Sequence, residues 1–187
     1  MARTWRPLMM AAALAAAGCG YNTIQTKDEA VNSAAAQIKT QLQRRSDLIP
    51  NLVETVKGFA RQETTVFIRV AEARGQLAGA VQSGDLQQMA QANQALNAPL
   101  GRLLALVENY PELKSNQNFL QLQDQLEGTE NRISVARQDY NRTVEDFNAY
   151  IRRFPYNLTA KVIGQGKPRE YFELTGPEAA EAPKVKF

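Results

Sequence analysis

The sequence predicts an all-α fold, an elongated antiparallel up-and-down helical bundle of three to four long helices with an N-terminal lipid anchor. Three observations support this prediction. Aromatic residues make up only 7% of the chain, and the many Ala, Gln and Leu residues favour helices over sheets. Apolar residues recur at every seventh position over long stretches, which is typical of helices that bury one stripe. The connections between these stretches are short, which makes consecutive helices antiparallel neighbours.

Residues 1–18 are predicted to be a cleaved signal peptide. Arg3 and Arg6 supply positive charge, and the apolar stretch Leu8–Ala17 is shorter than the ~20 residues needed to span a bilayer. The end of this segment, LAAAGC at residues 14–19, resembles a bacterial lipobox. By this resemblance, cleavage after Gly18 leaves Cys19 with a diacylglyceryl group on its sulfur and a fatty acyl chain such as palmitate on its amine. The alternative is an ordinary signal peptide with an incidental cysteine.

Lipid on Cys19 would hold the mature chain on a membrane, because each buried CH₂ contributes ~0.8 kcal/mol and stable anchoring takes more than one chain. Gly20 stands where Asp would favour retention, so we expect the outer membrane if the bacterium has two membranes. Without Arg3 and Arg6, the 22 basic residues of the chain fall to 20, against 19 acidic residues. A nucleic-acid partner is not expected, because no basic cluster stands out.

Residues 19–26 are predicted to be an acylated cysteine and a short tether, and Thr26 with Glu29 has the spacing of a capping box. Two series with seven-residue spacing then run through residues 31–77 without a change of phase. They are Val31, Ile38, Arg45, Leu52, Phe59, Val66 and Ala73, and Ala35, Leu42, Ile49, Val56, Glu63, Val70 and Leu77. Because a loop normally resets the phase, we expect a bent helix or two nearly collinear helices across Pro50. Ser46 and Asp47 could cap a helix that restarts there. The alternative is a true turn at Ser46–Pro50, which would give separate helices 27–45 and 48–82.

The next helix is predicted over residues 86–108. The loop 82–85 precedes it, with Asp85 as a cap signal, and Pro99 and Gly101 should bend it. The sequence Asn109-Tyr110-Pro111 ends this helix and begins a turn, after which Ser115 or Asn116 caps the final helix.

The final long helix has the clearest pattern. Its apolar stripe consists of Phe119, Leu126, Ile133, Tyr140, Phe147 and Phe154, and Phe154-Pro155 ends it. Tyr140, Phe147 and Tyr150 are interpreted as core residues, whereas Asn141 and Asn148 face either a neighbouring helix or solvent. Residues 158–164 could form a short helical turn, and Tyr171-Phe172 could dock on the bundle, which would cover residues 27–174. The tail 175–187 is expected to be disordered, because it has little apolar surface.

Four charged residues interrupt the predicted stripes, Arg45 and Glu63 on the first and Glu130 and Arg137 on the last. If the long helices are antiparallel, Glu63 could pair with Arg137, or Arg45 with Glu130, as a structural polar core that fixes the helix register. Two alternatives stay open, namely solvated charges at the edge of the stripe and a ligand site.

Several segments together resemble the LemA family of bacterial proteins. They are RRSDLIPNLV (44–53), VKG (56–58), Glu63, AR (73–74), YPEL (110–113), LQ (122–123), LEGTENRI (126–133), AR (136–137), YN (140–141), FN (147–148) and, more weakly, FP (154–155) and YFE (171–173). The resemblance extends over residues 21–173 and implies a helical, bundle-like fold anchored in a membrane at its N-terminus. It implies no catalytic residues. Many relatives look to have an N-terminal transmembrane helix, whereas this chain has a lipobox.

The sequence argues against an enzyme. There is no histidine, so Ser-His-Asp, Cys-His and Glu-x-x-His arrangements are excluded, and Cys19 is committed to lipid. No cofactor, metal site or phosphate-binding loop is predicted; Gly164-Gln165-Gly166-Lys167 lacks the strand and helix that such a loop needs.

The expected function is that of a non-catalytic binding or scaffold lipoprotein of the bacterial cell envelope, with its helices outside the cytoplasm. Its partners would be the membrane, through Cys19, and an envelope protein that recognises a helix face. The alternatives are an enzyme accessory with a ligand site between helices, which a deep pocket holding Glu63, Glu130, Arg137 and Tyr140 would favour, and a membrane-remodelling helical rod. The sequence does not determine the oligomeric state.

Overall fold

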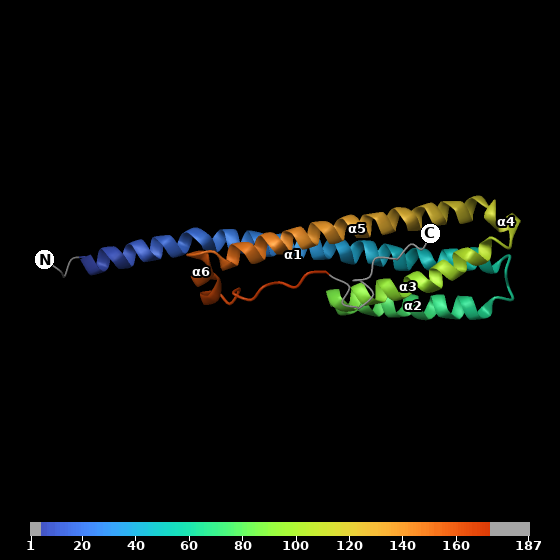
Figure 1. Ribbon diagram of the computed structural model, residues 1–187, viewed down its shortest axis with the longest axis horizontal. Helices are drawn as coiled ribbons and strands as arrows, with labels where there is room; N and C mark the ends of the chain where they lie inside the picture. The colour runs from blue at the N-terminus through green and yellow to red at the C-terminus, as the bar shows by residue number, and fades with distance from the viewer. Residues whose placement is uncertain (1–4, 173–187) are drawn as a thin grey trace, which may run out of the picture. The chain divides into compact units, whose positions relative to one another are not determined.

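The computed structural model describes residues 5–172, with side chains from residue 20 onward. All regular secondary structure in this range is α-helical, as predicted. The helices are α1 (Trp5–Lys57), α2 (Thr64–Ser83), α3 (Leu86–Val107), α4 (Pro111–Lys114), α5 (Gln117–Arg152) and α6 (Tyr156–Val162) (Figure 1). The predicted disordered tail lies outside the described residues.

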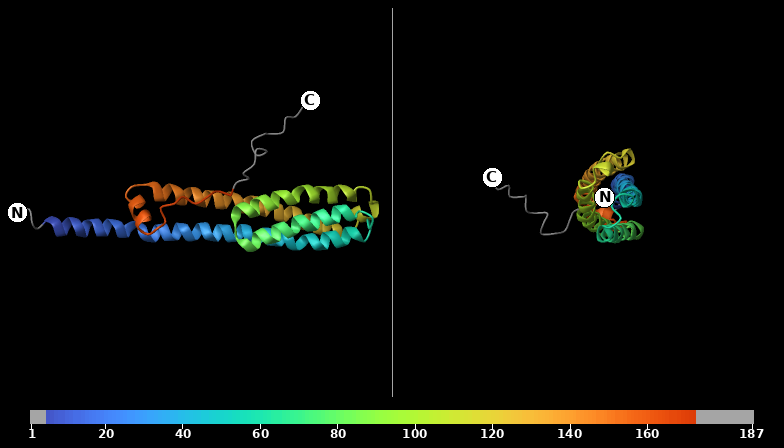
Figure 2. Two further views of the ribbon diagram at one scale, coloured as in Figure 1. Left: turned by 90° about the horizontal axis from the view of Figure 1, so that it is seen from below. Right: turned by 90° about the vertical axis from the view of Figure 1, so that its right-hand side faces the viewer.

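The chain forms two compact units. Of the described residues, unit 1 comprises 5–36 and 138–171, and unit 2 comprises 37–137 and 172. Helices α1 and α5 each contribute to both units, while α2, α3 and α4 belong to unit 2 and α6 to unit 1. Within unit 2, α2 and α3 lie side by side in every view (Figures 1 and 2).

Helix α1 continues through Pro50, as preferred from the sequence, and the alternative of a turn at Ser46–Pro50 is wrong. Proline has no backbone N–H, so the carbonyl four residues before Pro50 lacks the donor that it would have in a regular helix. That carbonyl belongs to Ser46, and Nε of Arg74 in α2 donates to it at 3.3 Å. A side chain from a neighbouring helix thus replaces the lost backbone hydrogen bond. Burial of Ile49 and Leu52, on either side of Pro50, favours the unbroken helix.

The prediction of helix through residue 82 is wrong at residues 58–63, where α1 has ended and α2 has not begun. The backbone turns there, and the N–H groups of Phe59 and Ala60 both donate to the carbonyl of Val56. Phe59 is 38% exposed although the seven-residue series places it in the core, and Ala60 is buried instead. Helices α1 and α2 both bury their apolar stripes in unit 2. The seven-residue series can therefore resume in α2 with the same phase, although the helix is interrupted at residues 58–63.

The predicted tether and capping box are also wrong. Residues 20–26 belong to α1, and Ile24 among them is fully buried in unit 1. The hydroxyl of Thr26 donates to the carbonyl of Asn22 at 2.9 Å, which is a bond inside a helix rather than a cap. The isolated spacing of Thr26 and Glu29 therefore does not mark a helix start here.

The predicted helix ends between residues 82 and 155 are confirmed. Asp85 caps α3, because its side chain accepts from the backbone N–H groups of Gln87 and Gln88, and Gly84 before it has a positive φ of 74°. Asn116 rather than Ser115 caps α5, by accepting from the N–H groups of residues 118 and 119. Helix α5 ends at Arg152, before Phe154-Pro155, and the predicted turn after it is α6.

The α5 stripe is buried as predicted from Phe119 through Phe147, but its last member, Phe154, is 79% exposed. The predicted docking of Tyr171-Phe172 is half right, since Phe172 is buried and Tyr171 is 38% exposed. The core of unit 2 includes Leu42, Ile49, Leu52, Val56, Val70, Leu77, Met89, Leu96 and Leu103, and that of unit 1 includes Ile24, Val31, Val144, Phe147, Ile151 and Ala160. Among the described helices, none has an apolar stretch long enough to cross a bilayer.

Candidate functional site

The most buried charge among the described side chains is Arg45, which lies on the stripe of α1 in unit 2 with a side chain only 8% exposed. Its Nη1 donates to Asn93 Oδ1, and its Nη2 donates to Asn97 Oδ1 at 2.8 Å. The carboxylate of Glu130, in α5, lies 2.6 Å from Nη1. We call these four residues the Arg45 junction; it joins α1, α3 and α5.

Helix geometry explains how α3 supplies two acceptors to one guanidinium. Asn93 and Asn97 are four residues apart and share a face of α3, so their amide oxygens reach the two terminal nitrogens of Arg45. Burial lowers the pKa of Arg45, and the negative charge of Glu130 raises it. Arginine is effectively always protonated in proteins, so Arg45 carries a permanent positive charge, which the negative charge of Glu130 opposes.

The partners of Arg45 differ in their solvent access. The Glu130 side chain is 47% exposed, so water shares the solvation of its carboxylate. Glu130 Oε2 has no directed hydrogen bond, which makes its contact with Nη1 an ion pair rather than a fork of hydrogen bonds. Arg45 Nε also has no acceptor. The two asparagines therefore supply the directed hydrogen bonds of the junction, and the sequence interpretation had not singled them out.

Of the two predicted pairings, the structure contains Arg45 with Glu130. No ion pair joins Glu63 to Arg137 in the described part of the chain. Glu63 lies in the connection before α2, where its carbonyl accepts from the N–H groups of Val66 and Phe67. Arg137 is half-buried on α5. The four interrupting charges thus do not form one polar core.

A small depression lies beside the junction, with a volume of about 140 Å³. Asn93, Asn97, Glu130, Arg137 and Phe172 contribute to its lining, together with Ala90, Gln94, Ile133 and Ser134. It is smaller than the ~300 Å³ at which small-molecule sites begin. Neither Glu63 nor Tyr140 reaches it, so the deep pocket that would favour a ligand site is not formed by these residues. No cluster of acidic or cysteine side chains suited to a metal ion occurs among the described residues.

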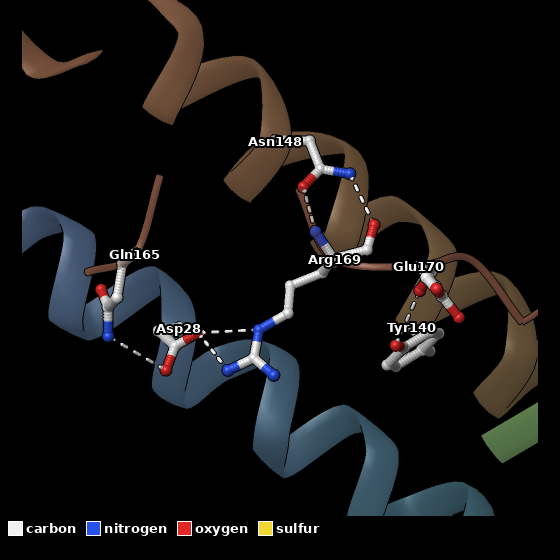
Figure 3. Close-up of polar contacts among 6 residues, drawn as sticks. All are labelled: Asp28, Tyr140, Asn148, Gln165, Arg169 and Glu170. Atoms are coloured by element: carbon white, nitrogen blue, oxygen red, sulfur yellow. Dashed lines mark hydrogen bonds and ion pairs between the residues drawn. The ribbon is translucent and has the colours of Figure 1, made fainter. Parts of the chain in front are cut away.

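Unit 1 contains a second polar cluster, which fixes residues 163–171 after α6. We call this extended segment the strap (Figure 3). The side-chain amide of Asn148 in α5 binds the backbone of Arg169 twice: it accepts from the Arg169 N–H at 2.7 Å and donates to the Arg169 carbonyl at 2.9 Å. The hydroxyl of Tyr140, also in α5, donates to the carbonyl of Glu170 at 2.9 Å. Two buried side chains of α5 therefore hold adjacent backbone groups of the strap.

Side chains of the strap reach α1 in turn. Nε and Nη2 of Arg169 donate to Asp28 Oδ1 at 3.1 and 2.6 Å, and Gln165 Nε2 donates to Asp28 Oδ2 at 3.4 Å. Figure 3 shows Asp28 between these two donors. Burial raises the pKa of Tyr140, with a lowering contribution from Arg169 and a raising one from Glu170.

The sequence interpretation missed Asp28 and Arg169 and left Asn148 undecided. Tyr140 and Phe147 are core residues, as predicted, while Tyr150 is half-buried and stacks on Tyr156 with 4.4 Å between ring centroids. The position of Asn148 next to the buried stripe was the one available signal for its role. The side chain of Cys19 lies outside the described side chains, and its lipidation stays a prediction.

These features define a helical protein whose internal polar groups connect helices and fix an extended segment. The chain belongs to the LemA family, whose model matches residues 34–187. This confirms the resemblance found in the sequence.

Among curated proteins, the chain is similar to the magnetosome proteins MamQ 1 and MamQ 2 of Paramagnetospirillum magneticum, with 28% identity over 178 residues, covering 82% of this chain and 64% of each relative. It is also 21% identical over 142 residues to Protein LemA of Metamycoplasma hominis, covering 76% of this chain and 64% of that protein. The chain thus spans just under two thirds of the length of these relatives. None of these names denotes an enzyme.

Proposed function

We propose that this protein is a non-catalytic binding or scaffold lipoprotein of the bacterial cell envelope, held on a membrane by lipid on Cys19. The observation that carries the proposal is the Arg45 junction. A buried arginine on α1 is occupied by two asparagines of α3 and by Glu130 of α5. Two of the four charged residues that interrupt the helical stripes, Arg45 and Glu130, are thus used for a contact between helices, which suits a rigid surface for helix-face recognition.

The location in this proposal comes from the lipobox-like sequence that ends at Cys19. The two acyl chains of the diacylglyceryl group and the third on the amine would provide stable anchorage, since a single chain gives only marginal binding. In this arrangement, an antiparallel up-and-down bundle outside the cytoplasm presents its helix faces to an envelope protein. Anchorage on one membrane raises the effective concentration of the two proteins.

Anchorage is tested by growing cells with an alkyne-bearing fatty acid and comparing the natural chain with Cys19→Ser. We expect label and membrane sedimentation for the natural chain only. Gly20→Ala is unsuitable as a control, because a Cβ there would lie 2.6 Å from Cδ1 of Tyr156. Asn22→Ala, at an exposed position, keeps the cysteine and serves instead. Equal labelling of the Cys19→Ser chain would exclude lipid on this residue.

Binding is tested with a photo-crosslinking residue at exposed apolar positions of unit 2. Ile68 and Val135 are each 57% exposed, and Glu72 is an exposed polar control on α2. We expect one of the apolar positions to crosslink a single envelope protein, identified by mass spectrometry, and to lose that product in the Cys19→Ser chain. Products identical at Glu72 and at both apolar positions would indicate random collision and contradict a specific recognition face.

A further inference from the structure

Exposed apolar side chains gather where α5 ends and α6 follows, in unit 1. Phe154 is 79% exposed, Leu158 is 55% exposed and Val162 is 87% exposed. Leu158 and Val162 are four residues apart in α6 and so share one face of it. We call residues 150–167 the α5–α6 corner.

The opposite side of this corner is firmly packed. Ala160 is fully buried, and the ring of Tyr156 lies so close to Gly20 of α1 that a Cβ on Gly20 would be 2.6 Å from Cδ1. Tyr156 also stacks on Tyr150 of α5, with 17° between the ring planes. Figures 1 and 2 show α6 beside the N-terminal part of α1. The three exposed apolar side chains therefore stand on a fixed support that lies next to residue 20.

The corner also concentrates positive charge. Residues 150–167 contain Arg152, Arg153, Lys161 and Lys167 and no acidic residue. All four basic side chains are exposed, and none forms an ion pair within the described part of the chain. The whole chain, in contrast, has 22 basic and 19 acidic residues, so residues 150–167 are far more positively charged than the chain as a whole.

We propose that the α5–α6 corner docks on the surface of an anionic bilayer, with Phe154, Leu158 and Val162 in the headgroup region and the basic side chains against lipid phosphates. Apolar side chains flanked by Arg and Lys are the composition of interfacial segments, which lie on a membrane without spanning it. Tyr21, which follows Gly20 in α1, is 46% exposed and adds an aromatic side chain of the kind found at membrane surfaces.

The inference rests on the proposed anchorage, because Gly20 directly follows Cys19. A lipidated Cys19 would bring the membrane to the residue against which Tyr156 packs. The corner then gives a second attachment point and fixes the orientation of unit 1, whereas acyl chains alone would leave it free to turn. Charge complementarity selects a bilayer as the occupant over a second copy of this chain, since two copies would oppose the same four basic side chains.

The test uses the acylated full chain reconstituted in vesicles, with a nitroxide on Val162→Cys. Lipid on Cys19 keeps its sulfur from taking the label. Paramagnetic accessibility to dissolved oxygen and to a water-soluble nickel chelate reports whether the label is immersed. We expect immersion in vesicles of phosphatidylglycerol and phosphatidylcholine, and less in phosphatidylcholine alone.

The matched control is a label on Ala30→Cys, an exposed position of α1 in unit 1. It lies ten residues from Gly20, about 15 Å along the helix, and we expect it to stay in water. The double change Arg153→Gln with Lys161→Gln should shift the docking equilibrium toward the undocked form by about fivefold per removed charge. Arg142→Gln, at an exposed position of α5, should leave it unchanged.

Four results would overturn the inference: a water-exposed label at residue 162 in anchored protein, equal immersion in both kinds of vesicle, equal immersion at residue 30, or spin–spin broadening that reveals a second copy at the corner. Failure of the anchorage itself looks different, because the protein would lack the fatty acid and stay in solution. In that event, flotation of the unacylated full chain with the same two kinds of vesicle tests the corner directly. Selective flotation with phosphatidylglycerol would support it, and no flotation would overturn it.

Discussion

The Arg45 junction of unit 2 and the strap of unit 1 use similar polar side chains, but the junction connects helices whereas the strap contacts hold an extended segment of backbone. In the junction, a guanidinium with an 8% exposed side chain binds only side chains, and these come from two other helices. In the strap, the side chain of Arg169 is 44% exposed, and the buried side chains, Asn148 and Tyr140, bind backbone groups.

The difference follows from what each region must satisfy. Apart from the Ser46 carbonyl, which Arg74 satisfies, the interior backbone groups of α1 bond within the helix, as helical backbone groups generally do. Contacts of α1, α3 and α5 with one another can therefore use side chains and set the rotation and register of each helix. The strap has no helix or sheet of its own, and its backbone groups need partners from elsewhere. We therefore expect the junction to control helix packing in unit 2 and the strap contacts to control the order of residues 163–171.

The largest effect should follow from Arg45→Met. The change removes the donor while Asn93, Asn97 and Glu130 remain, so unsatisfied polar groups replace a satisfied cluster, at a cost of about 2–4 kcal/mol in the free energy of unfolding. Urea denaturation measures the loss. Arg132→Met, at an exposed position of α5, is the control and should change stability by less than about 0.5 kcal/mol. Equal stability of the two variants would show that the junction does not hold the helices.

The second largest effect should come from Asn148→Ala, which removes both hydrogen bonds to the Arg169 backbone. We expect a loss of about 1–3 kcal/mol, because a backbone donor and a backbone acceptor of Arg169, both in part-buried hydrogen bonds, lose their partner. Hydrogen exchange at the Arg169 amide should accelerate by a corresponding factor, whereas exchange in the middle of α5 should change little. Asp146→Ala, at an exposed position of α5, serves as the control. Unchanged exchange at Arg169 would mean that Asn148 does not hold the strap.

These two sites also separate what the sequence could predict from what it could not. Seven-residue spacing identified the stripe of α5, and Arg45 and Glu130 stood out because charges interrupted such stripes. Asp85 and the 115–116 region were found because capping is a local interaction between near neighbours. Each of these signals lies within one helix or at its end, where period and propensity act directly.

The strap left no such signal. Asp28 and Arg169 are 141 residues apart in the sequence, and Asn148 binds backbone groups, which look alike in every residue. The connection at residues 58–63 was missed for the opposite reason, since an intact periodic pattern concealed it. Periodicity reports which side chains are buried, and two separate helices that bury their stripes in one unit can satisfy it as well as a continuous helix does.

An intermediate effect is expected for Tyr140→Phe, which removes the hydrogen bond to the Glu170 carbonyl at a cost of about 1 kcal/mol near neutral pH. Burial raises the pKa of Tyr140 above its ordinary value of 10.0. The unfolded chain therefore loses this proton first, and the stability present below pH 10 declines as the pH rises through the folded-state pKa. The stability difference between the natural chain and Tyr140→Phe should shrink above pH 10. A difference that is constant through that range would contradict the raised pKa.

The smallest effect should follow from Asp28→Asn, which keeps the shape of the acceptor for Arg169 and Gln165 but removes its charge. Arg169 is 44% exposed, so water screens the pair and the expected loss is only about 0.5–1 kcal/mol. The loss should shrink further in high salt, whereas the larger loss in Arg45→Met should persist because that guanidinium is buried. Urea denaturation of both variants at low and high salt makes the comparison. A salt response as weak for Asp28→Asn as for Arg45→Met would mean that the strap, too, relies on buried charge.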